Sequence, residues 1–184
     1  HGWSTRARAE DSTPAVQAGM IDEALEKLGV GSAIVVVHSW SGALGARMAL
    51  DYPRRVAGLV MLAPVAYPWR GGVGWYNEAI TTPVIGPLLA YTVTLPLGYL
   101  LAEREARGAF LPQVMPDGFV SNTSTALMLR PREFLANARD LVTLKAAVAE
   151  QAPRYGDIKA PTTVISGEID SVDMGAAESI VAGV

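Results

Sequence analysis

The sequence changes from a strand pattern to a helix pattern within ten residues, Ala33-Ile34-Val35-Val36-Val37-His38-Ser39-Trp40-Ser41-Gly42. The apolar run 33–37 shows no polar alternation, which predicts a buried strand covered on both faces, as in parallel sheets. A helical pattern begins at about Ser41 and ends before Pro53. A serine is therefore expected in a tight turn between a buried strand and a helix.

The segments on either side of this turn continue the alternation of strand and helix. Upstream, Thr13-Pro14 is a helix start signal, and apolar residues at helical spacing continue to Leu28, before Gly29. Downstream, residues 56–62 and 161–166 read as two further buried strands. Short links between strand, helix and strand indicate a βαβ unit. The predicted fold class is therefore α/β, with a mostly parallel sheet and helices on both faces.

A long insert interrupts this rhythm. It contains aromatic turns, an apolar segment and a polar helix over about 132–151. We divide the chain into a core α/β part at 1–64, a helical cap or lid insert at 65–152, and a core part at 153–184, where a weak helix is expected at 176–182. Residues 83–102 carry no charged side chain, but prolines and glycines interrupt them, which favours a buried or lid helix pair over a membrane span.

Composition excludes several classes of function. The net charge is −3 and no Lys/Arg cluster is present, so we expect no nucleic-acid partner. The absence of cysteine excludes disulfides and thiolate catalysis, and the two histidines, His1 and His38, are too few for a His-rich metal site. The N-terminus shows no signal peptide and reads as trimmed. We expect a small-molecule substrate, no cofactor, no metal, no membrane partner and a cytoplasmic location.

Several stretches resemble the α/β-hydrolase family, especially its esterase, C–C hydrolase and haloperoxidase-like branch. That family carries Gly-His-Ser-x-Gly-Gly at the turn, where this chain has Val37-His38-Ser39-Trp40-Ser41-Gly42. The likeness continues through residues 49–56, 58–64 and 157–170, and residues 1–4 are similar to the end of the family's Gly-x-Gly-x-Ser loop. The resemblance implies the α/β-hydrolase fold, a serine nucleophile in a nucleophile elbow, and a cap domain.

Two serines compete for the role of nucleophile. The family register, with His before the serine and Gly three residues after it, favours Ser39. Val37 stands where the family has Gly, and a β-branched residue there is expected to crowd the turn. Sterics alone favour Ser41, which lies between the small residues Ser39 and Ala43. A helix-capping role for Ser39 is the purely structural alternative.

The resemblance also implies an acid and a base, in the chain order serine, acid, histidine. Asp170 occupies the position of the acid, with Glu168 and Asp173 as competitors and a turn or helix cap as the structural alternative. No histidine follows His38, which in the family packs beneath the nucleophile. We therefore expect these 184 residues to lack a complete triad, either because residues are missing or because the chain is inactive. Trp40 supplies the one visible oxyanion-hole N–H.

The aromatic content of the insert predicts an apolar substrate. The candidate substrate-binding residues are Trp40, Trp69, Trp75 and Tyr76, and packing of the cap on the body is the alternative for each. The expected function is hydrolysis of an ester or related carbonyl compound with an apolar group, through an acyl-serine. The alternative is a catalytically inactive α/β-hydrolase relative that binds a small apolar ligand or partner.

Overall fold

The computed structural model describes residue 3 and residues 12–167. The chain divides into two compact units. The core unit comprises Glu10–Gly71 and Thr143–Val184, and the helical unit comprises His1–Ala9 and Gly72–Val142. The boundaries predicted from the sequence between the core parts and the cap insert, at 64/65 and 152/153, stay a prediction.

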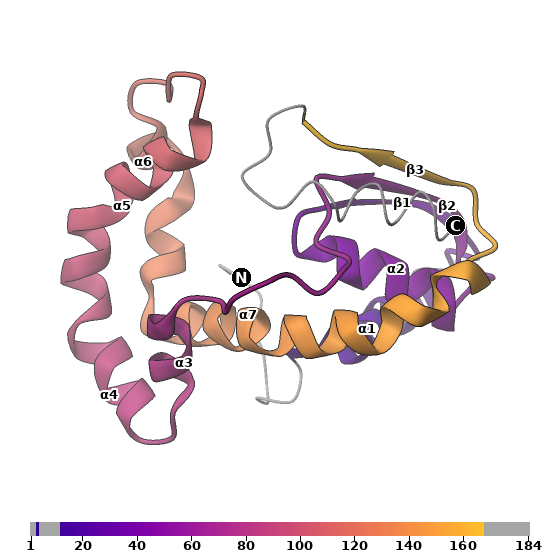
Figure 1. The fold of residues 1–184 in the computed structure, drawn as a ribbon, viewed down its shortest axis with the longest axis horizontal. Helices are drawn as coiled ribbons and strands as arrows, with labels where there is room; N and C mark the ends of the chain where they lie inside the picture. Colours follow the sequence, from indigo (N-terminus) through magenta and orange to yellow (C-terminus); the bar gives the residue numbers. More distant parts are fainter. Residues whose placement is uncertain (1–2, 4–11, 168–184) are drawn as a thin grey trace. The chain divides into compact units, whose positions relative to one another are not determined.

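The core unit is built on a three-stranded parallel sheet in the order β1-β2-β3 (Figure 1). The strands are β1 (Ala33–His38), β2 (Val56–Leu62) and β3 (Thr162–Ile165). Val36 pairs with Val60 and Val60 pairs with Thr163, so the carboxyl ends of all three strands lie at one edge. The predicted βαβ unit and parallel sheet are confirmed.

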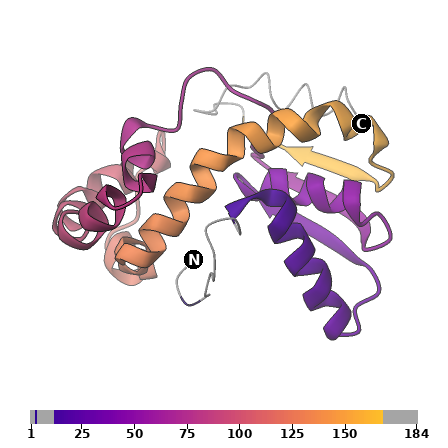
Figure 2. The same ribbon diagram turned by 90° about the horizontal axis from the view of Figure 1, so that it is seen from below.

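Helices pack against one face of this sheet. The helices α1 (Pro14–Lys27) and α2 (Ser41–Asp51) and the 3-10 helix η3 (Ala152–Asp157) share one core cluster with the strands, and the end of α7 (Pro131–Gln151) packs on Ala43 of α2. The Thr13 hydroxyl accepts a hydrogen bond from the Val16 N–H at 3.3 Å, as the start signal predicts. Val37, Leu59 and Met61 are buried in the core with side chains of α2 and η3, including Met48 and Tyr155. Figure 2 shows α7 as one continuous helix.

The opposite face of the sheet corrects one expectation from the sequence. The run 33–37 was expected to be covered on both faces, but Ile34 is 68% exposed and Val36 is 63% exposed. Alternate residues of a strand point to opposite faces. Val35 and Val37 meet the core cluster, whereas Ile34 and Val36 lie on a face that the described helices leave open. An apolar run therefore did not guarantee two covered faces.

The described part of the helical unit contains five helical segments and the first part of α7. They are α3 (Trp75–Thr81), α4 (Ile85–Thr92), α5 (Thr94–Phe110), α6 (Phe119–Asn122) and the 3-10 helix η2 (Ser124–Leu129). A small core joins Ile80, Ala90, Leu135 and Ala138. Gly86 allows a close approach, because a Cβ there would lie 1.8 Å from the Ile80 carbonyl oxygen.

The uncharged segment 83–102 folds as two helices, as its prolines and glycines indicate. Among the described residues, no single helix is long and apolar enough to cross a membrane. The helices Ile85–Thr92 and Pro96–Phe110 have together the length and composition of a membrane span, but they are bent by 78° relative to each other. One side of the pair is exposed, with Leu88 at 62% and Leu100 at 78%, so of the two alternatives, a buried pair and a lid pair, full burial does not hold. Gly86 and Ala90 occupy the buried side of α4 instead.

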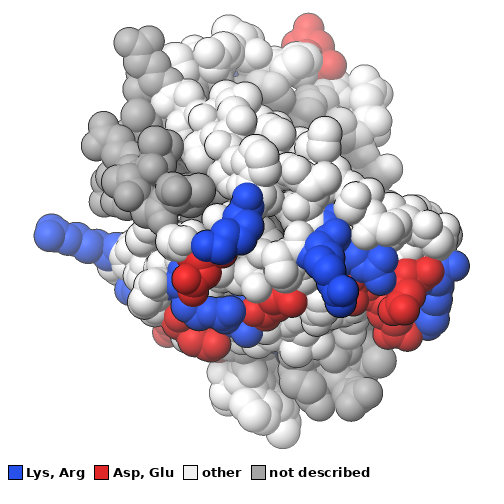
Figure 3. Space-filling view, turned by 90° about the vertical axis from the view of Figure 1, so that its right-hand side faces the viewer, with Lys and Arg blue, Asp and Glu red and all other residues white. Residues whose placement is uncertain are grey.

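Ion pairs tie the helices of the core unit together at the surface. Arg47 of α2 bonds Asp51 at 2.5 Å and Glu150 of α7 at 3.1 Å. Arg55 bonds Asp22 of α1 at 2.6 Å. Figure 3 shows basic and acidic atoms interspersed on the face it draws, without a patch of one sign.

Candidate active site

The turn between β1 and α2 holds Ser39 in an unusual backbone conformation. Its φ is +52°, a left-handed value that is rare for residues other than glycine. This conformation costs about 1–2 kcal/mol for an L-residue. The Ser39 N–H donates to the Leu62 carbonyl at 3.0 Å, and the Ser39 carbonyl accepts from the N–H groups of Gly42 at 2.8 Å and Val65 at 2.9 Å. These three hydrogen bonds hold the strained residue in place.

Ser41 is engaged differently. It is the first residue of α2, and its hydroxyl donates to the His38 carbonyl at 2.7 Å. The same oxygen accepts the His38 N–H at 2.9 Å. Both hydrogen bonds close the turn locally, so the Ser41 side chain acts as its brace.

Two glycines of α2 make room for the turn. A Cβ at Gly42 would lie 2.5 Å from Pro64 Cβ, so the segment after β2 approaches the start of the helix very closely. A Cβ at Gly45 would lie 2.8 Å from Val37 Cγ1. The crowding expected from Val37 is thus relieved, because its branched side chain occupies the space that Gly45 leaves.

The start of α2 provides electrostatics suited to an anion. Trp40 is the N-cap residue of α2, with φ −48° and ψ −41°. Backbone N–H groups in the first turn of a helix lie at the positive end of its dipole. Negative charge that develops beside Ser39 would therefore be stabilised there.

The candidate substrate-binding residues fall into two groups. Trp40 and Trp69 pack against a small cluster in the core unit, formed by Ala43, Leu144 and Val148. The Lys145 ammonium lies 5.9 Å from the Trp69 ring centroid and donates to the Gly71 carbonyl at 2.7 Å. The structure therefore brings Trp40 and Trp69 to one cluster.

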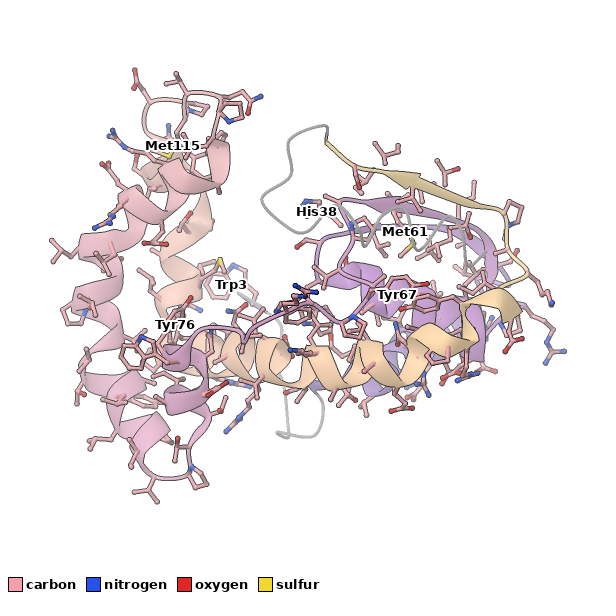
Figure 4. The ribbon with its side chains drawn as sticks, in the orientation of Figure 1. Trp3, His38, Met61, Tyr67, Tyr76 and Met115 are labelled. Atoms are coloured by element: carbon pink, nitrogen blue, oxygen red, sulfur yellow. The ribbon has the colours of Figure 1, made fainter. Side chains whose placement is uncertain are left out.

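The second pair lies in the helical unit. Trp75 and Tyr76 contact each other edge to face, with ring centroids 6.4 Å apart. Trp75 is 80% exposed, and Tyr76, labelled in Figure 4, is 52% exposed. These rings are accessible at the surface of their unit.

The acid candidates Asp170, Glu168 and Asp173 lie outside the described residues. The strand β3 ends at Ile165, at the same edge of the sheet as Ser39. There the Ala63 N–H, which follows β2, donates to the Ile165 carbonyl at 2.7 Å. Within the described part of the chain, no group of three or more His, Cys, Asp or Glu could hold a metal ion.

His38 departs from what the resemblance implies. Its side chain is exposed at the carboxyl end of β1 rather than packed beneath the turn (Figure 4). It pairs with Leu62 in the register of β1 and β2, on the same open face as Ile34 and Val36. The described helices leave that face uncovered, which accounts for the exposure.

A buried polar network behind the turn was not predicted from the sequence. The Gln151 side-chain amide donates to the Ala43 carbonyl of α2 and to the Tyr155 hydroxyl, both at 2.9 Å. The Tyr155 hydroxyl donates to the Ala66 carbonyl at 2.5 Å, and burial raises the pKa of Tyr155 to about 12. The network ties the end of α7 to α2 and to the segment after β2.

The family assignment follows from a comparison with known families. The family model described as alpha/beta hydrolase fold matches residues 1–179. The chain belongs to the alpha/beta-hydrolase fold family.

Solved structures of other alpha/beta hydrolases share the fold at low sequence identity. An alpha/beta hydrolase enzyme from a Medee basin deep-sea metagenome library aligns with TM-score 0.70 and 19% identity, over 100% of this chain and 64% of that one. The epoxide hydrolase VrEH1 of Vigna radiata aligns with TM-score 0.59 and 18% identity, over 98% and 65%. The enol-lactonase of Burkholderia xenovorans aligns with TM-score 0.63 and 18% identity, over 100% and 65%.

A curated relative matches a shorter stretch. It is the dihydrolipoyllysine-residue acetyltransferase component of the acetoin cleaving system of Cupriavidus necator, 34% identical over 67 residues. The match covers 36% of this chain and 18% of that protein. The chain spans less than two thirds of the length of the relatives named here.

Proposed function

We propose that this alpha/beta-hydrolase chain carries the nucleophile of a hydrolase, Ser39, which forms an acyl-serine with an ester or related carbonyl substrate. The observation that carries the proposal is the left-handed φ of +52° at Ser39. Strain in a non-glycine residue at the end of a strand persists only where surrounding contacts hold it, and it gathers at functional sites. A nucleophile elbow needs this conformation to lift the serine oxygen above the sheet.

In the proposed reaction, Ser39 Oγ attacks the carbonyl carbon and passes its proton to a base. The Trp40 N–H at the start of α2 stabilises the oxyanion of the tetrahedral intermediate. Collapse of that intermediate releases the alcohol, which takes up the proton, and water then hydrolyses the acyl-serine. Asp170 is the proposed acid that orients the base, and residues 39–184 contain no histidine.

Ser41 supports this assignment by its own role. Its hydroxyl already donates to the His38 carbonyl and accepts the His38 N–H. Attack by Ser41 would break both hydrogen bonds and open the turn. Ser39 as nucleophile leaves this brace intact.

We propose that the apolar group of the substrate contacts aromatic rings. Trp40 and Trp69, which pack in one cluster beside the start of α2, are the rings that the core unit offers for this contact. Aromatic side chains combine a large apolar area with a polar tip, which suits a substrate with an apolar acyl or aryl part.

A fluorophosphonate probe with intact-protein and peptide mass spectrometry tests the nucleophile. With excess probe we expect a slowly formed adduct on Ser39, because the base that would activate its hydroxyl is not at its expected place in the sequence. We expect no adduct in Ser39→Ala and a retained adduct in Ser41→Ala. An adduct on Ser41, or none on a folded chain, would overturn the proposal, and the second result would favour the ligand-binding alternative.

A second measurement separates acylation from turnover. The 184 residues alone should show no burst with an activated ester, because the base is not at its expected place in the sequence. Ser39-dependent acylation and turnover of such an ester would refute the expected lack of a complete triad.

A further inference from the structure

Two buried polar side chains at the junction of α7 and η3 contact both segments that flank the turn between β1 and α2. Gln151 is 1% exposed and Tyr155 is 2% exposed. The Gln151 amide donates to the Ala43 carbonyl in the first turn of α2 and to the Tyr155 hydroxyl. That hydroxyl donates in turn to the Ala66 carbonyl, in the segment after β2. The pair therefore joins α2 to this segment through side chains that all belong to the core unit.

The two segments that the pair joins meet again at the Ser39 carbonyl. This oxygen accepts the Gly42 N–H of α2 at 2.8 Å and the Val65 N–H of the segment after β2 at 2.9 Å. Ala43 directly follows Gly42, and Ala66 directly follows Val65. Each N–H that holds Ser39 thus lies one residue before a carbonyl that the buried pair binds. A shift of either segment against the other would lengthen one of the two hydrogen bonds to the Ser39 carbonyl.

The hydrogen bond from Gln151 is not needed to satisfy the Ala43 carbonyl. A carbonyl at this place in a helix accepts the N–H four residues on, so the Gln151 amide adds a second hydrogen bond to it. Burial of an amide is costly unless it is hydrogen-bonded, and a fully satisfied buried network is rigid. The Gln151 side chain therefore fixes the position of α2 rather than completing its backbone hydrogen bonds.

The Tyr155 side chain is fixed from a second direction. The ring of Tyr67, labelled in Figure 4, packs edge to face on the Tyr155 ring with centroids 5.3 Å apart. Burial raises the pKa of Tyr155 to about 12, so its hydroxyl stays protonated at neutral pH and remains a donor to the Ala66 carbonyl. Both ends of the link between α2 and the segment after β2 are therefore held in one arrangement.

We infer that Gln151 and Tyr155 are positioning residues for Ser39: they set the spacing between α2 and the segment after β2, and with it the placement of the Ser39 hydroxyl and the Trp40 N–H. Both act through the backbone of the turn. The inference rests on the proposed function, because it concerns the same acyl transfer. Misplacement of reacting groups by about 1 Å can cost about 100-fold in rate, so the loss of either link should be measurable.

The rate of fluorophosphonate labelling at Ser39, with excess probe on the full 184-residue chain, tests the inference. Gln151→Met keeps a similar side-chain volume without the amide, and it should lower the labelling rate constant at least about tenfold. Tyr155→Phe removes only the hydroxyl and should lower it in the same direction. Val56→Ala is the matched control, because Val56 is buried in the same unit at the amino end of β2, and its labelling rate should equal that of the wild type. Circular dichroism checks that each variant is folded.

Amide hydrogen exchange reports on the turn without any reaction. The reference is the Leu59 amide, which donates to the Pro161 carbonyl at 2.9 Å within the sheet. In Gln151→Met, the Gly42 and Val65 amides should exchange at least about tenfold faster than in the wild type, relative to the Leu59 amide. A purely structural role would instead lower the stability of the whole unit and accelerate all three amides alike.

The outcomes separate this inference from the proposed function. An unchanged labelling rate, or exchange that does not single out the turn, in both Gln151→Met and Tyr155→Phe would overturn the inference. Equal losses in Val56→Ala would overturn it as well, because they would trace the effect to stability alone. Absence of any Ser39 adduct on the folded wild type would refute the proposed function, and selective exchange at the turn would then decide by itself whether the pair positions Ser39.

Discussion

Gly45→Ala should destabilise the core unit chiefly because of one neighbour, Val37. A Cβ at residue 45 would lie 2.8 Å from Val37 Cγ1 and 3.0 Å from both Val37 Cγ2 and Leu59 Cδ1. Overpacking of this kind costs about 1–3 kcal/mol. Replacing a helical glycine by alanine returns about 0.5–1 kcal/mol. We therefore expect a net loss of about 1 kcal/mol in the free energy of unfolding.

The Val37→Ala background isolates the cause of this loss. Two of the three close contacts involve γ carbons of Val37, and alanine has none. In that background Gly45→Ala should be neutral or slightly stabilising, because the gain in helix propensity is then opposed only by the flexible tip of Leu59. The two substitutions should therefore couple by about 1–2 kcal/mol.

A double-mutant cycle by urea unfolding, followed by far-UV circular dichroism, measures the coupling. Gly31→Ala is the matched control, because a Cβ there would meet no heavy atom within 4 Å. Its coupling to Val37→Ala should stay below about 0.5 kcal/mol. If Gly45→Ala costs as much in the Val37→Ala background as in the wild type, the account of how this turn accepts a β-branched residue is refuted.

Three further predictions concern strain, pH and salt. Ser39→Gly should raise the free energy of unfolding by about 1 kcal/mol while abolishing the fluorophosphonate adduct, and lowered stability would argue against strain at φ +52°. Burial raises the pKa of Tyr155 from 10.0 to about 12, so its contribution is complete below pH 10 and is lost as the pH rises toward 12. In wild type, the free energy of unfolding should therefore fall by about 2–3 kcal/mol as the pH rises from 10 to 12, and this fall should be absent in Tyr155→Phe. Urea unfolding at several pH values measures it, and an equal fall in the variant would contradict the raised pKa of Tyr155. Arg47→Met should cost about 1 kcal/mol at low salt and less at about 1 M salt, and a salt-independent cost would point to packing of the arginine stem.

The elements around the turn could be predicted because their signals are local. Residues 56–62 form an apolar run that is closed on both sides, by Arg55 and by Ala63-Pro64, and β2 occupies Val56–Leu62. Thr13 and Pro14 fix the start of α1 through a hydroxyl cap and a preset φ. Signals of this kind depend on the nearest neighbours in sequence, so they survive without knowledge of the tertiary structure.

Contacts between distant residues could not be predicted from the same patterns. Gln151 reaches the Ala43 carbonyl across 108 positions, and periodicity does not tell which polar residue of a helix turns inward. The space that Gly45 leaves for the Val37 side chain could not be predicted either, because a glycine inside a helical pattern indicates only a lower helix propensity. Coverage of a strand depends on elements elsewhere in the chain, which is why the exposure of Val36 was missed.

The distribution of backbone strain argues for a functional demand on one edge of the sheet. Three non-glycine residues of the described chain have a positive φ. Ser39 and Ala63, with φ values of +52° and +39°, directly follow β1 and β2, and Val84, with φ +67°, precedes α4 in the helical unit. The two residues at the sheet are each held by a hydrogen bond to the next strand, from the Ser39 N–H to the Leu62 carbonyl and from the Ala63 N–H to the Ile165 carbonyl. Glycine at both positions would remove about 1–2 kcal/mol of strain per residue. Selection for stability alone would therefore favour glycine at both positions. Ligands of open α/β sheets bind at the carboxyl ends of the strands, which is where these two residues lie. The strain therefore lies where chemistry at Ser39 would need it.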